Sequence, residues 1–303
     1  MTEAVRIAVI GGGLMGHGIA QVFAVAGHPV RVFDASAATL ATVTERVRRN
    51  LVDLGKDPGA AARVSCHATL AEAVTGAAAV FEAGPENLAI KQQLFVDIEA
   101  AAPADALLAS NTSVIPITQI MSGLRTGERA LGTHWWNPPY MVPLVEVVRT
   151  PTTSEAAVDA MIDLLARAGK TPVRIEKDVP GFVGNRLQHA LWREAISLVQ
   201  HGVCDAKTVD TVVKASFGRR LAVLGPLENA DLVGTDLTLA IHENVLPAVD
   251  RTPDALPLLR ELVAAGKLGM KSGEGFQRWT PDEVAAVRLR LLQHLKALEG
   301  LGI

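Results

Sequence analysis

The fold of this chain is decided by the stretch Val5-Arg6-Ile7-Ala8-Val9-Ile10-Gly11-Gly12-Gly13-Leu14-Met15-Gly16-His17-Gly18-Ile19-Ala20. Residues 5–10 are mostly β-branched or apolar, which is typical of a strand buried in a parallel sheet. Gly11, Gly13 and Gly16 fit the G-x-G-x-x-G spacing, which permits a tight turn, close approach of the backbone to a diphosphate and close packing of helix on strand. The stretch therefore predicts a dinucleotide-binding turn.

The residues after the glycines extend the same unit. Leu14 and Met15 begin a predicted helix whose free N–H groups and positive dipole end point at a bound diphosphate. The helix ends near Gly27, and a second strand over residues 30–33 is followed directly by Asp34. An acid at this distance binds the adenosine ribose hydroxyls and repels a 2′-phosphate. The sequence thus predicts NAD rather than NADP as cofactor, with an ordinary strand-helix-strand turn as the alternative.

Length, charge and cysteine content set limits on the class of protein. A chain of 303 residues is long enough for two domains, each with its own core. The formal net charge of −3, with mixed signs, makes nucleic acid and an anionic membrane poor partners. No apolar run is long enough for a membrane span, and no secretion signal opens the chain. Cys66 and Cys204 lie far apart, so we expect reduced thiols in a cytoplasmic protein and no metal site.

Alternating strand and helix patterns fill the first part of the chain. The expected elements are helices over 37–54 and around Lys91 and Phe95, and strands over 77–83, 106–109, 144–148 and 169–175. This order predicts an α/β fold, with a Rossmann-type, doubly wound and mostly parallel sheet in an NAD-binding domain over residues 1–179.

The apolar period changes from two to 3.6 after the turn-rich residues 178–182. We therefore predict a second, all-helical domain over residues 180–303, for substrate binding and dimerisation. One helix follows Asn185 and stops at Gly202, and another begins with the capping box at residues 280–283. The apolar faces of these helices exceed what one small domain needs, so we expect a homodimer.

Two side chains form a candidate acid/base pair. His134 lies beside two indoles and Asn137, and Glu146 lies in the middle of a strand-like apolar run. A carboxylate buried there costs several kcal/mol unless it is protonated or paired, and His134 is the nearest candidate partner. A structural histidine and a solvent-facing glutamate are the alternatives. The polar residues 110–113 follow a strand at the edge where the crevice of such a sheet opens, although helix capping is another use for them.

These motifs together resemble the NAD-dependent L-3-hydroxyacyl-CoA dehydrogenases and their relatives that oxidise free hydroxy acids. The resemblance covers nearly the whole chain and rests on Gly11 to Ala20, Glu86-Asn87 with Lys91, Ser110 to Ser113, His134 with Asn137-Pro138, Pro143 to Val147, Pro180 to Arg186, Gly225-Pro226 and Lys271 to Phe276.

The resemblance implies a role for each matching residue. His134 becomes the general acid/base that Glu146 orients, and Ser113 and Asn185 hold the substrate oxygen. The implied cofactor contacts, besides the glycine turn, Asp34 and Ser113, are Glu86, Lys91, Asn137 and Lys271. By composition alone, each of these could be an ordinary surface or capping residue.

Two departures from the acyl-CoA members bear on the substrate. Those members commonly carry a longer, lysine-rich helical hairpin after the first βαβ unit, whereas residues 54–59 are short and nearly neutral. Residues 216–228 look more like those of L-gulonate 3-dehydrogenase (lambda-crystallin) and carnitine dehydrogenase, which act on free carboxylates. Arg220 is a candidate carboxylate anchor, with a surface cation paired to a nearby acid as the alternative. A relative that oxidises a pyridine aldehyde, similar over 179–184 and 219–226, widens the substrate list.

The leading hypothesis is hydride transfer between NAD and the 3-hydroxy group of an L-3-hydroxy acid, with the free acid slightly preferred. The first alternative is an L-3-hydroxyacyl-CoA substrate such as 3-hydroxybutyryl-CoA. A non-catalytic, NAD-binding structural or sensor protein is an alternative of another class, and a reductase of imines or other carbonyl analogues is a third.

Overall fold

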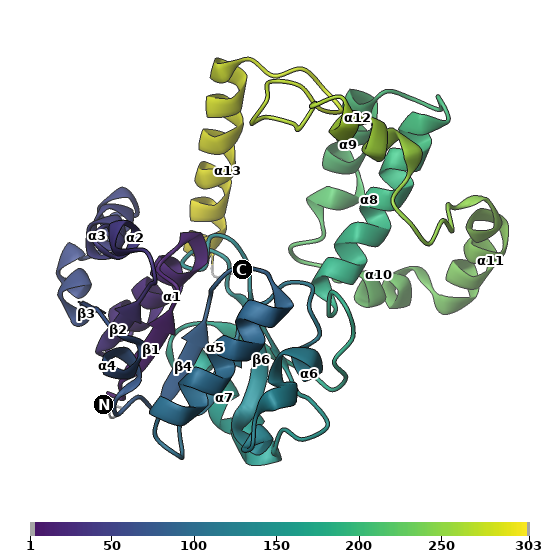
Figure 1. Cartoon of the computed structure of the whole chain (residues 1–303). Helices are drawn as coiled ribbons and strands as arrows, with labels where there is room; N and C mark the ends of the chain where they lie inside the picture. The colour runs from purple at the N-terminus through teal and green to yellow at the C-terminus, as the bar shows by residue number, and fades with distance from the viewer. Residues whose placement is uncertain (1–3, 302–303) are drawn as a thin grey trace. The chain divides into compact units, whose positions relative to one another are not determined.

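The structure is a computed structural model that describes residues 4–301 of the chain (Figure 1). The chain divides into two compact units between Arg186 and Leu187. Each unit has its own architecture. The first unit is built on a β-sheet, and the second contains helices joined by loops.

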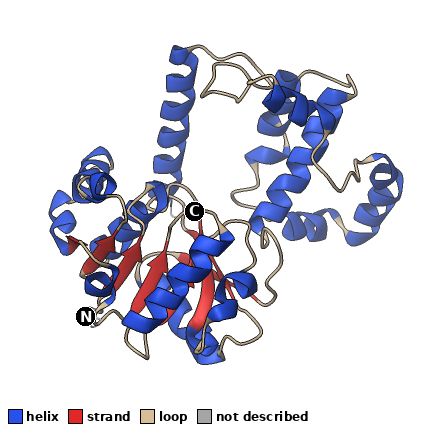
Figure 2. Cartoon of the chain, in the orientation of Figure 1, coloured by secondary structure: helices blue, strands red, loops and turns tan. Residues whose placement is uncertain are grey.

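One sheet of eight strands forms the centre of the first unit (Figure 2). The strand order is β3-β2-β1-β4-β5-β6-β7-β8, and neighbouring strands are parallel except β6 and β7, which are antiparallel. The strands are β1 (Ile7–Ile10), β2 (Val30–Phe33), β3 (Val64–His67), β4 (Ala79–Glu82), β5 (Leu107–Ser110), β6 (Ala130–Trp135), β7 (Leu144–Val148) and β8 (Thr171–Ile175). The predicted doubly wound, mostly parallel sheet is thereby confirmed.

Helices cover both faces of this sheet, because side chains at alternate strand positions point to opposite faces. Ile7 and Val9 pack in one apolar cluster with α1, α3 and α7, whereas Ala8 and Ile10 pack in another with α4, α5 and α6. The α-helices of this unit are α1 (Leu14–Val25), α2 (Ala37–Leu40), α3 (Val43–Asp53), α4 (Leu70–Val74), α5 (Leu88–Ala101), α6 (Ile117–Ile120) and α7 (Glu155–Arg167). The 3-10 turns are η1 (Pro58–Arg63), η2 (Met121–Gly123) and η3 (Gly127–Arg129).

The structure differs from the expected elements in two places. The helix expected over 37–54 is broken into α2 and α3, and the Thr42 hydroxyl at the break donates to the Thr39 carbonyl at 2.8 Å. Such a local side-chain bond competes with helical hydrogen bonding. Strands β3 and β6 are absent from the expected set, because β6 mixes a glycine, a histidine and a tryptophan and β3 is a short strand at the sheet edge.

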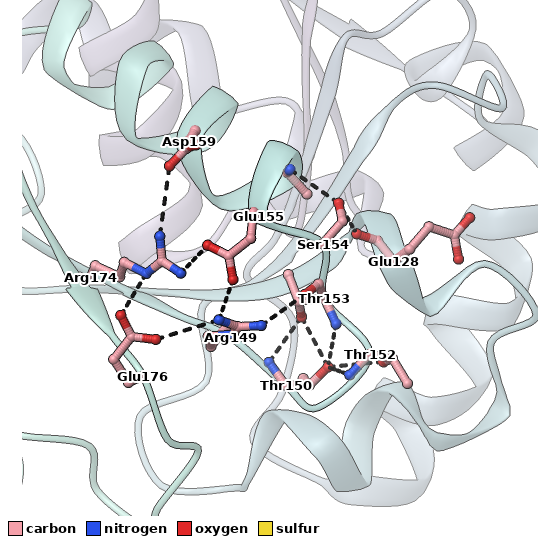
Figure 3. Close-up of polar contacts among 11 residues, drawn as sticks. Glu128, Arg149, Thr150, Thr152, Thr153, Ser154, Glu155, Asp159, Arg174 and Glu176 are labelled. Carbon is pink, nitrogen blue, oxygen red and sulfur yellow. Dashed lines mark hydrogen bonds and ion pairs between the residues drawn. The ribbon is translucent and has the colours of Figure 1, made fainter.

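An ion-pair cluster closes the edge of the sheet formed by the carboxyl ends of β7 and β8 (Figure 3). Arg174 contacts Glu155, Asp159 at 3.7 Å and Glu176 at 2.7 Å, and Arg149 contacts Glu155 and Glu176. Because β7 runs antiparallel to β6, this edge is opposite to the carboxyl ends of β1, β4, β5 and β6. Two arginines face three acids, and each charged group has an opposite charge as its partner, so we interpret the cluster as structural.

The second unit contains helices and loops with little buried apolar surface. Its helices are α8 (Gly184–Gln200, which begins in the first unit), α9 (Ala206–Ala215), α10 (Pro226–Val233), α11 (Thr235–Val245), α12 (Pro257–Ala264) and α13 (Pro281–Leu301), with 3-10 turns η4 (Phe217–Arg219) and η5 (Leu246–Ala248). The predicted capping box is present, since Thr280 N–H donates to the Glu283 carboxylate at 2.8 Å. Among the described side chains after Arg186, Leu256 is the only buried hydrophobic one.

Candidate active site

The glycine turn between β1 and α1 has the shape that a bound diphosphate requires. Gly11 has φ +104°, and a Cβ there would lie 2.5 Å from the Ala83 carbonyl oxygen. A Cβ on Gly16 would lie 1.7 Å from the Gly11 carbonyl oxygen. The start of α1 can therefore pack this closely against the turn only because residue 16 has no side chain. In contrast, a Cβ on Gly13 would meet no atom within 4 Å. The space beside Gly13, at the start of α1, is therefore open to a phosphate group.

Asp34 is held next to this turn by two backbone N–H groups. One of its carboxylate oxygens accepts the Gly12 N–H at 2.7 Å, and the other accepts the Ser36 N–H at 2.7 Å. The Arg46 guanidinium donates to the Gly12 carbonyl from α3. Asp34 is thus fixed at the end of β2 where an adenosine ribose would lie. These residues fit NAD.

His134 and Glu146 lie directly opposite each other on the antiparallel strands β6 and β7. His134 Nδ1 and Glu146 Oε2 are 2.7 Å apart, and the two side chains are only 4% and 1% exposed. The second oxygen, Oε1, accepts the backbone N–H groups of Val183 at 2.9 Å and Gly184 at 3.0 Å. Burial raises the pKa of Glu146, but the hydrogen bonds from His134, Gly184 and Val183 more than compensate and hold it below its ordinary range.

Aromatic rings surround the His134 imidazole. The Trp136 ring centroid lies 5.3 Å from that of His134, and the Phe182 ring centroid lies 5.5 Å away. Phe182 has φ +50°, a left-handed conformation that is rare for a residue of its size. A Cβ on Gly184 would lie 2.4 Å from the Trp136 ring. The structure therefore adds Trp136, Phe182 and Gly184 to the residues that fix the position of His134.

The loop after β5 is held from two sides. Glu86 Oε1 accepts the Thr112 hydroxyl at 2.5 Å and the N–H groups of Ser113 at 3.0 Å and Val114 at 3.3 Å. The Asn185 side-chain amide donates to the Ser113 carbonyl at 3.0 Å. The structure thus brings Ser113 and Asn185, which are far apart in the sequence, into direct contact. Glu86 is expected to contact the cofactor, and in the structure it also supports the loop.

Lys91 is more buried than a cofactor-contacting lysine is expected to be. Its side chain is 1% exposed, and its ammonium lies 2.7 Å from Glu82 Oε1 and 3.5 Å from Glu86 Oε2. This burial favours a role in holding carboxylates over direct contact with a ligand. Glu82 was not among the candidate residues, although the same signal that identifies Glu146, a carboxylate in a buried strand, is present there.

The remaining candidates occupy exposed positions. Asn137 is exposed in the loop after β6, and Arg220 is exposed directly after η4 in the second unit. Lys271, also in the second unit, borders an apolar cavity of about 600 Å³ lined by Trp192, Ile196 and Phe276 among others. Within residues 4–301, no three His, Cys, Asp or Glu side chains are grouped to hold a metal ion. None of the helices described is both long and apolar enough to cross a membrane.

Comparisons with known proteins match both parts of the chain to one family. The NAD-binding domain model of the 3-hydroxyacyl-CoA dehydrogenases matches residues 6–179, and the C-terminal domain model of the same enzymes matches residues 181–279. The chain is 35% identical to 5-formyl-3-hydroxy-2-methylpyridine 4-carboxylate 5-dehydrogenase of Mesorhizobium japonicum, over 98% of this chain and 97% of that protein. It is 38% identical to a probable 3-hydroxybutyryl-CoA dehydrogenase of Bacillus subtilis, over 90% of this chain and 97% of that protein.

A solved structure matches nearly the full length of the chain. It is a 5-formyl-3-hydroxy-2-methylpyridine 4-carboxylic acid 5-dehydrogenase, described as an NAD⁺-dependent dismutase, with a TM-score of 0.91, 33% identity and coverage of 99% of this chain and 98% of that one. The glycine turn, the doubly wound sheet and the matches along both parts of the sequence lead to one conclusion. The chain belongs to the 3-hydroxyacyl-CoA dehydrogenase family and is an NAD-dependent oxidoreductase that acts on CH–OH groups.

Proposed function

We propose that this chain transfers a hydride between NAD and the 3-hydroxy group of an L-3-hydroxy acid, with His134 as general acid/base. The observation that carries the proposal is the buried contact of 2.7 Å between His134 Nδ1 and Glu146 Oε2. Bound NAD supplies the hydride acceptor. Gly13, the N–H groups of Leu14 and Met15, and Asp34 would hold it, with Glu86 and Asn137 as further contacts.

The paired side chains divide the acid/base work between them. Because Nδ1 of His134 faces Glu146, the other ring nitrogen, Nε2, is left to take the hydroxyl proton in the oxidative direction. The Glu146 carboxylate stabilises the imidazolium that results, and in reduction His134 returns the proton. Ser113 and Asn185 hold the substrate oxygen while its bond order changes.

A free carboxylate is the preferred substrate class, and an L-3-hydroxyacyl-CoA is the alternative. In support, α3 ends at Asp53 and is followed by the short turn η1 in place of a lysine-rich helical hairpin. The relative from Mesorhizobium japonicum, which matches nearly the full length, is named for a pyridine carboxylate. This favours a heteroaromatic carboxylate as a second candidate. The Bacillus subtilis relative, named for 3-hydroxybutyryl-CoA, favours the thioester.

A homodimer is the second part of the proposal. Large hydrophobic side chains of the second unit are exposed on several helices, including Leu191 at 40%, Val212 at 57%, Leu227 at 80% and Leu239 at 60%. A soluble unit that buries so few apolar side chains gains stability from a partner surface. Sedimentation velocity tests this. A single species with twice the mass of the chain is expected, and a monomer at micromolar concentration contradicts it.

The substrate experiment compares free hydroxy acids, heteroaromatic carboxylates and acyl-CoA thioesters by the appearance of NADH. Free carboxylates are expected to give the higher kcat/KM, and Arg220→Ala is expected to raise KM for them about tenfold, as loss of a bidentate anchor would. Arg219→Ala, at the neighbouring exposed arginine, is the matched control. If kcat/KM for 3-hydroxybutyryl-CoA exceeds that for every free acid by orders of magnitude, the preference for a free acid is wrong.

The catalytic assignment has its own test. His134→Ala is expected to abolish turnover while the affinity for NADH, measured by fluorescence titration, stays within about threefold, because His134 takes the proton and does not hold the dinucleotide. Turnover at the wild-type rate contradicts the assignment and favours the non-catalytic alternative.

A further inference from the structure

We propose that Glu82 is a positioning residue for the reaction, which holds the loop of residues 110–114 so that Ser113 presents its hydroxyl to the substrate oxygen. The inference rests on the proposed role of Ser113. It concerns a carboxylate that is buried behind the candidate site.

Glu82 is a fully buried charge with a complete set of partners. Its side chain is 0% exposed at the carboxyl end of β4. Oε1 accepts the Gly84 N–H at 2.7 Å and the Lys91 ammonium at 2.7 Å. Oε2 accepts the same ammonium at 3.0 Å and the Ser110 hydroxyl at 2.6 Å. Replacement of a buried ion pair by apolar residues of similar volume is often neutral or stabilising, so stability alone does not explain these charges.

The partners of Glu82 lead to both ends of one loop. Ser110, at the end of β5, is bound by Glu82 directly. Ser113 is reached through two intermediates, because Lys91 also lies 3.5 Å from Glu86, and Glu86 accepts the Ser113 N–H at 3.0 Å. The Glu82 backbone carbonyl accepts the Asn111 N–H at 2.8 Å, which is a third attachment between Glu82 and the loop.

The loop also touches the strand that carries His134. Asn111 Oδ1 accepts the Trp135 N–H at 3.0 Å, one residue after His134. The loop therefore sets the position of Ser113 relative to the candidate base. A catalytic group must be held within about 0.5 Å of its productive position, and a misplacement of about 1 Å can lower the rate about 100-fold.

The experiment is a double-mutant cycle between Glu82→Gln and Ser113→Ala, with kcat measured well below the unfolding temperature of each variant. Glu82→Gln is expected to lower kcat about 10- to 100-fold in the wild-type background and less than about threefold in the Ser113→Ala background. The second loss shrinks because Glu82 acts through Ser113. Equal losses in both backgrounds overturn the inference.

A milder variant keeps the test valid if Glu82→Gln fails to fold. Ser110→Ala removes the 2.6 Å hydrogen bond to Glu82 and the longer one, at 3.4 Å, that Ser110 Oγ accepts from the Thr112 N–H, and it leaves the ion pair of Glu82 with Lys91 intact. It is expected to lower kcat about three- to tenfold, again only when Ser113 is present. Equal losses with and without Ser113 overturn the inference here too.

A control variant separates positioning from general stability. Glu99 is another buried carboxylate, on α5 two turns after Lys91. It accepts the N–H groups of Arg125 and Thr126. Glu99→Gln is expected to lower the unfolding temperature with kcat within about twofold. A kcat loss as large as that of Glu82→Gln overturns the inference.

The kcat of Ser113→Ala alone separates the positioning role of Glu82 from the proposed function of the chain. A wild-type kcat shows that Ser113 has no catalytic part, which overturns the inference while the His134 assignment stands on its own test. A reduced kcat together with equal Glu82→Gln losses leaves the proposed function intact and removes only the positioning role.

Discussion

Replacement of Glu146 by glutamine gives the sharpest test of the His134–Glu146 pair. The amide has nearly the same shape as the carboxylate, and its oxygen can still accept the N–H groups of Val183 and Gly184. Its NH₂ group then faces His134 Nδ1 as a donor. The neutral imidazole must accept at Nδ1 and carry its proton on Nε2, so the nitrogen that should take the substrate proton is already protonated.

The magnitude follows from the geometry of the contact. A hydrogen bond to a charged group contributes about 1.5–3 kcal/mol, and the wrong tautomer adds a further penalty. A total of about 3–4 kcal/mol corresponds to a kcat about 100- to 1000-fold below wild type. The unfolding temperature is expected to fall, as for Glu99→Gln, because the charge-assisted bond to His134 is lost, but the variant is expected to fold because the amide oxygen keeps both backbone partners.

The assay is steady-state NADH formation with the best substrate from the panel, together with an NADH titration and a thermal unfolding curve. A kcat within about fivefold of wild type, in a variant that binds NADH and is folded, refutes the proposed function of Glu146. Glu99→Gln serves again as the control for loss of a buried carboxylate.

The stability of Glu146→Gln is also expected to depend less on pH than that of wild type. Because the pKa of folded Glu146 lies below its ordinary value, about 4.3 in the unfolded chain, the ionised carboxylate stabilises the fold above that pH. This contribution is lost as the pH falls through the lower, folded pKa. Wild type is therefore expected to lose more stability than Glu146→Gln on acidification from about pH 6 to pH 3. Parallel curves of unfolding free energy against pH contradict this.

Three further predictions address the cofactor turn and the sheet edge. Gly16→Ala is expected to raise Kd for NADH more than about tenfold or to prevent folding, because its Cβ would lie 1.7 Å from the Gly11 carbonyl oxygen; wild-type affinity in a titration contradicts it. Asp34→Asn is expected to weaken NAD binding about tenfold and to narrow the preference over NADP, measured as the ratio of kcat/KM values. Arg174→Gln, which removes the contacts with Glu155, Asp159 and Glu176, is expected to move the unfolding temperature by no more than about 3 °C, since the three acids are solvent-exposed and Arg174 is itself 29% exposed; a larger drop shows that the cluster matters for stability.

The NAD-binding part of this protein can be predicted from short stretches of sequence. The run of apolar residues, the glycine spacing and Asp34 lie within one βαβ unit, so local patterns suffice to predict the sheet type and NAD. The helical second part is predicted for the same reason, because the 3.6 period and the capping box at Thr280 are local signals. The break at Thr42 and the strand containing His134 are not predicted, since a local hydroxyl bond and sheet pairing decide them.

The tertiary structure decides how the polar residues combine. Glu146 and His134 are twelve positions apart, and only the antiparallel register of β6 and β7 places them opposite each other. Ser113 meets Asn185 because the carboxyl end of β5 and the start of α8 lie at one edge of the sheet. For Lys91, the sequence motif and the tertiary structure favour different roles. Its motif suggests a ligand contact, but the fold buries its ammonium against Glu82, because a charge inside the sheet needs an opposite charge within hydrogen-bond distance.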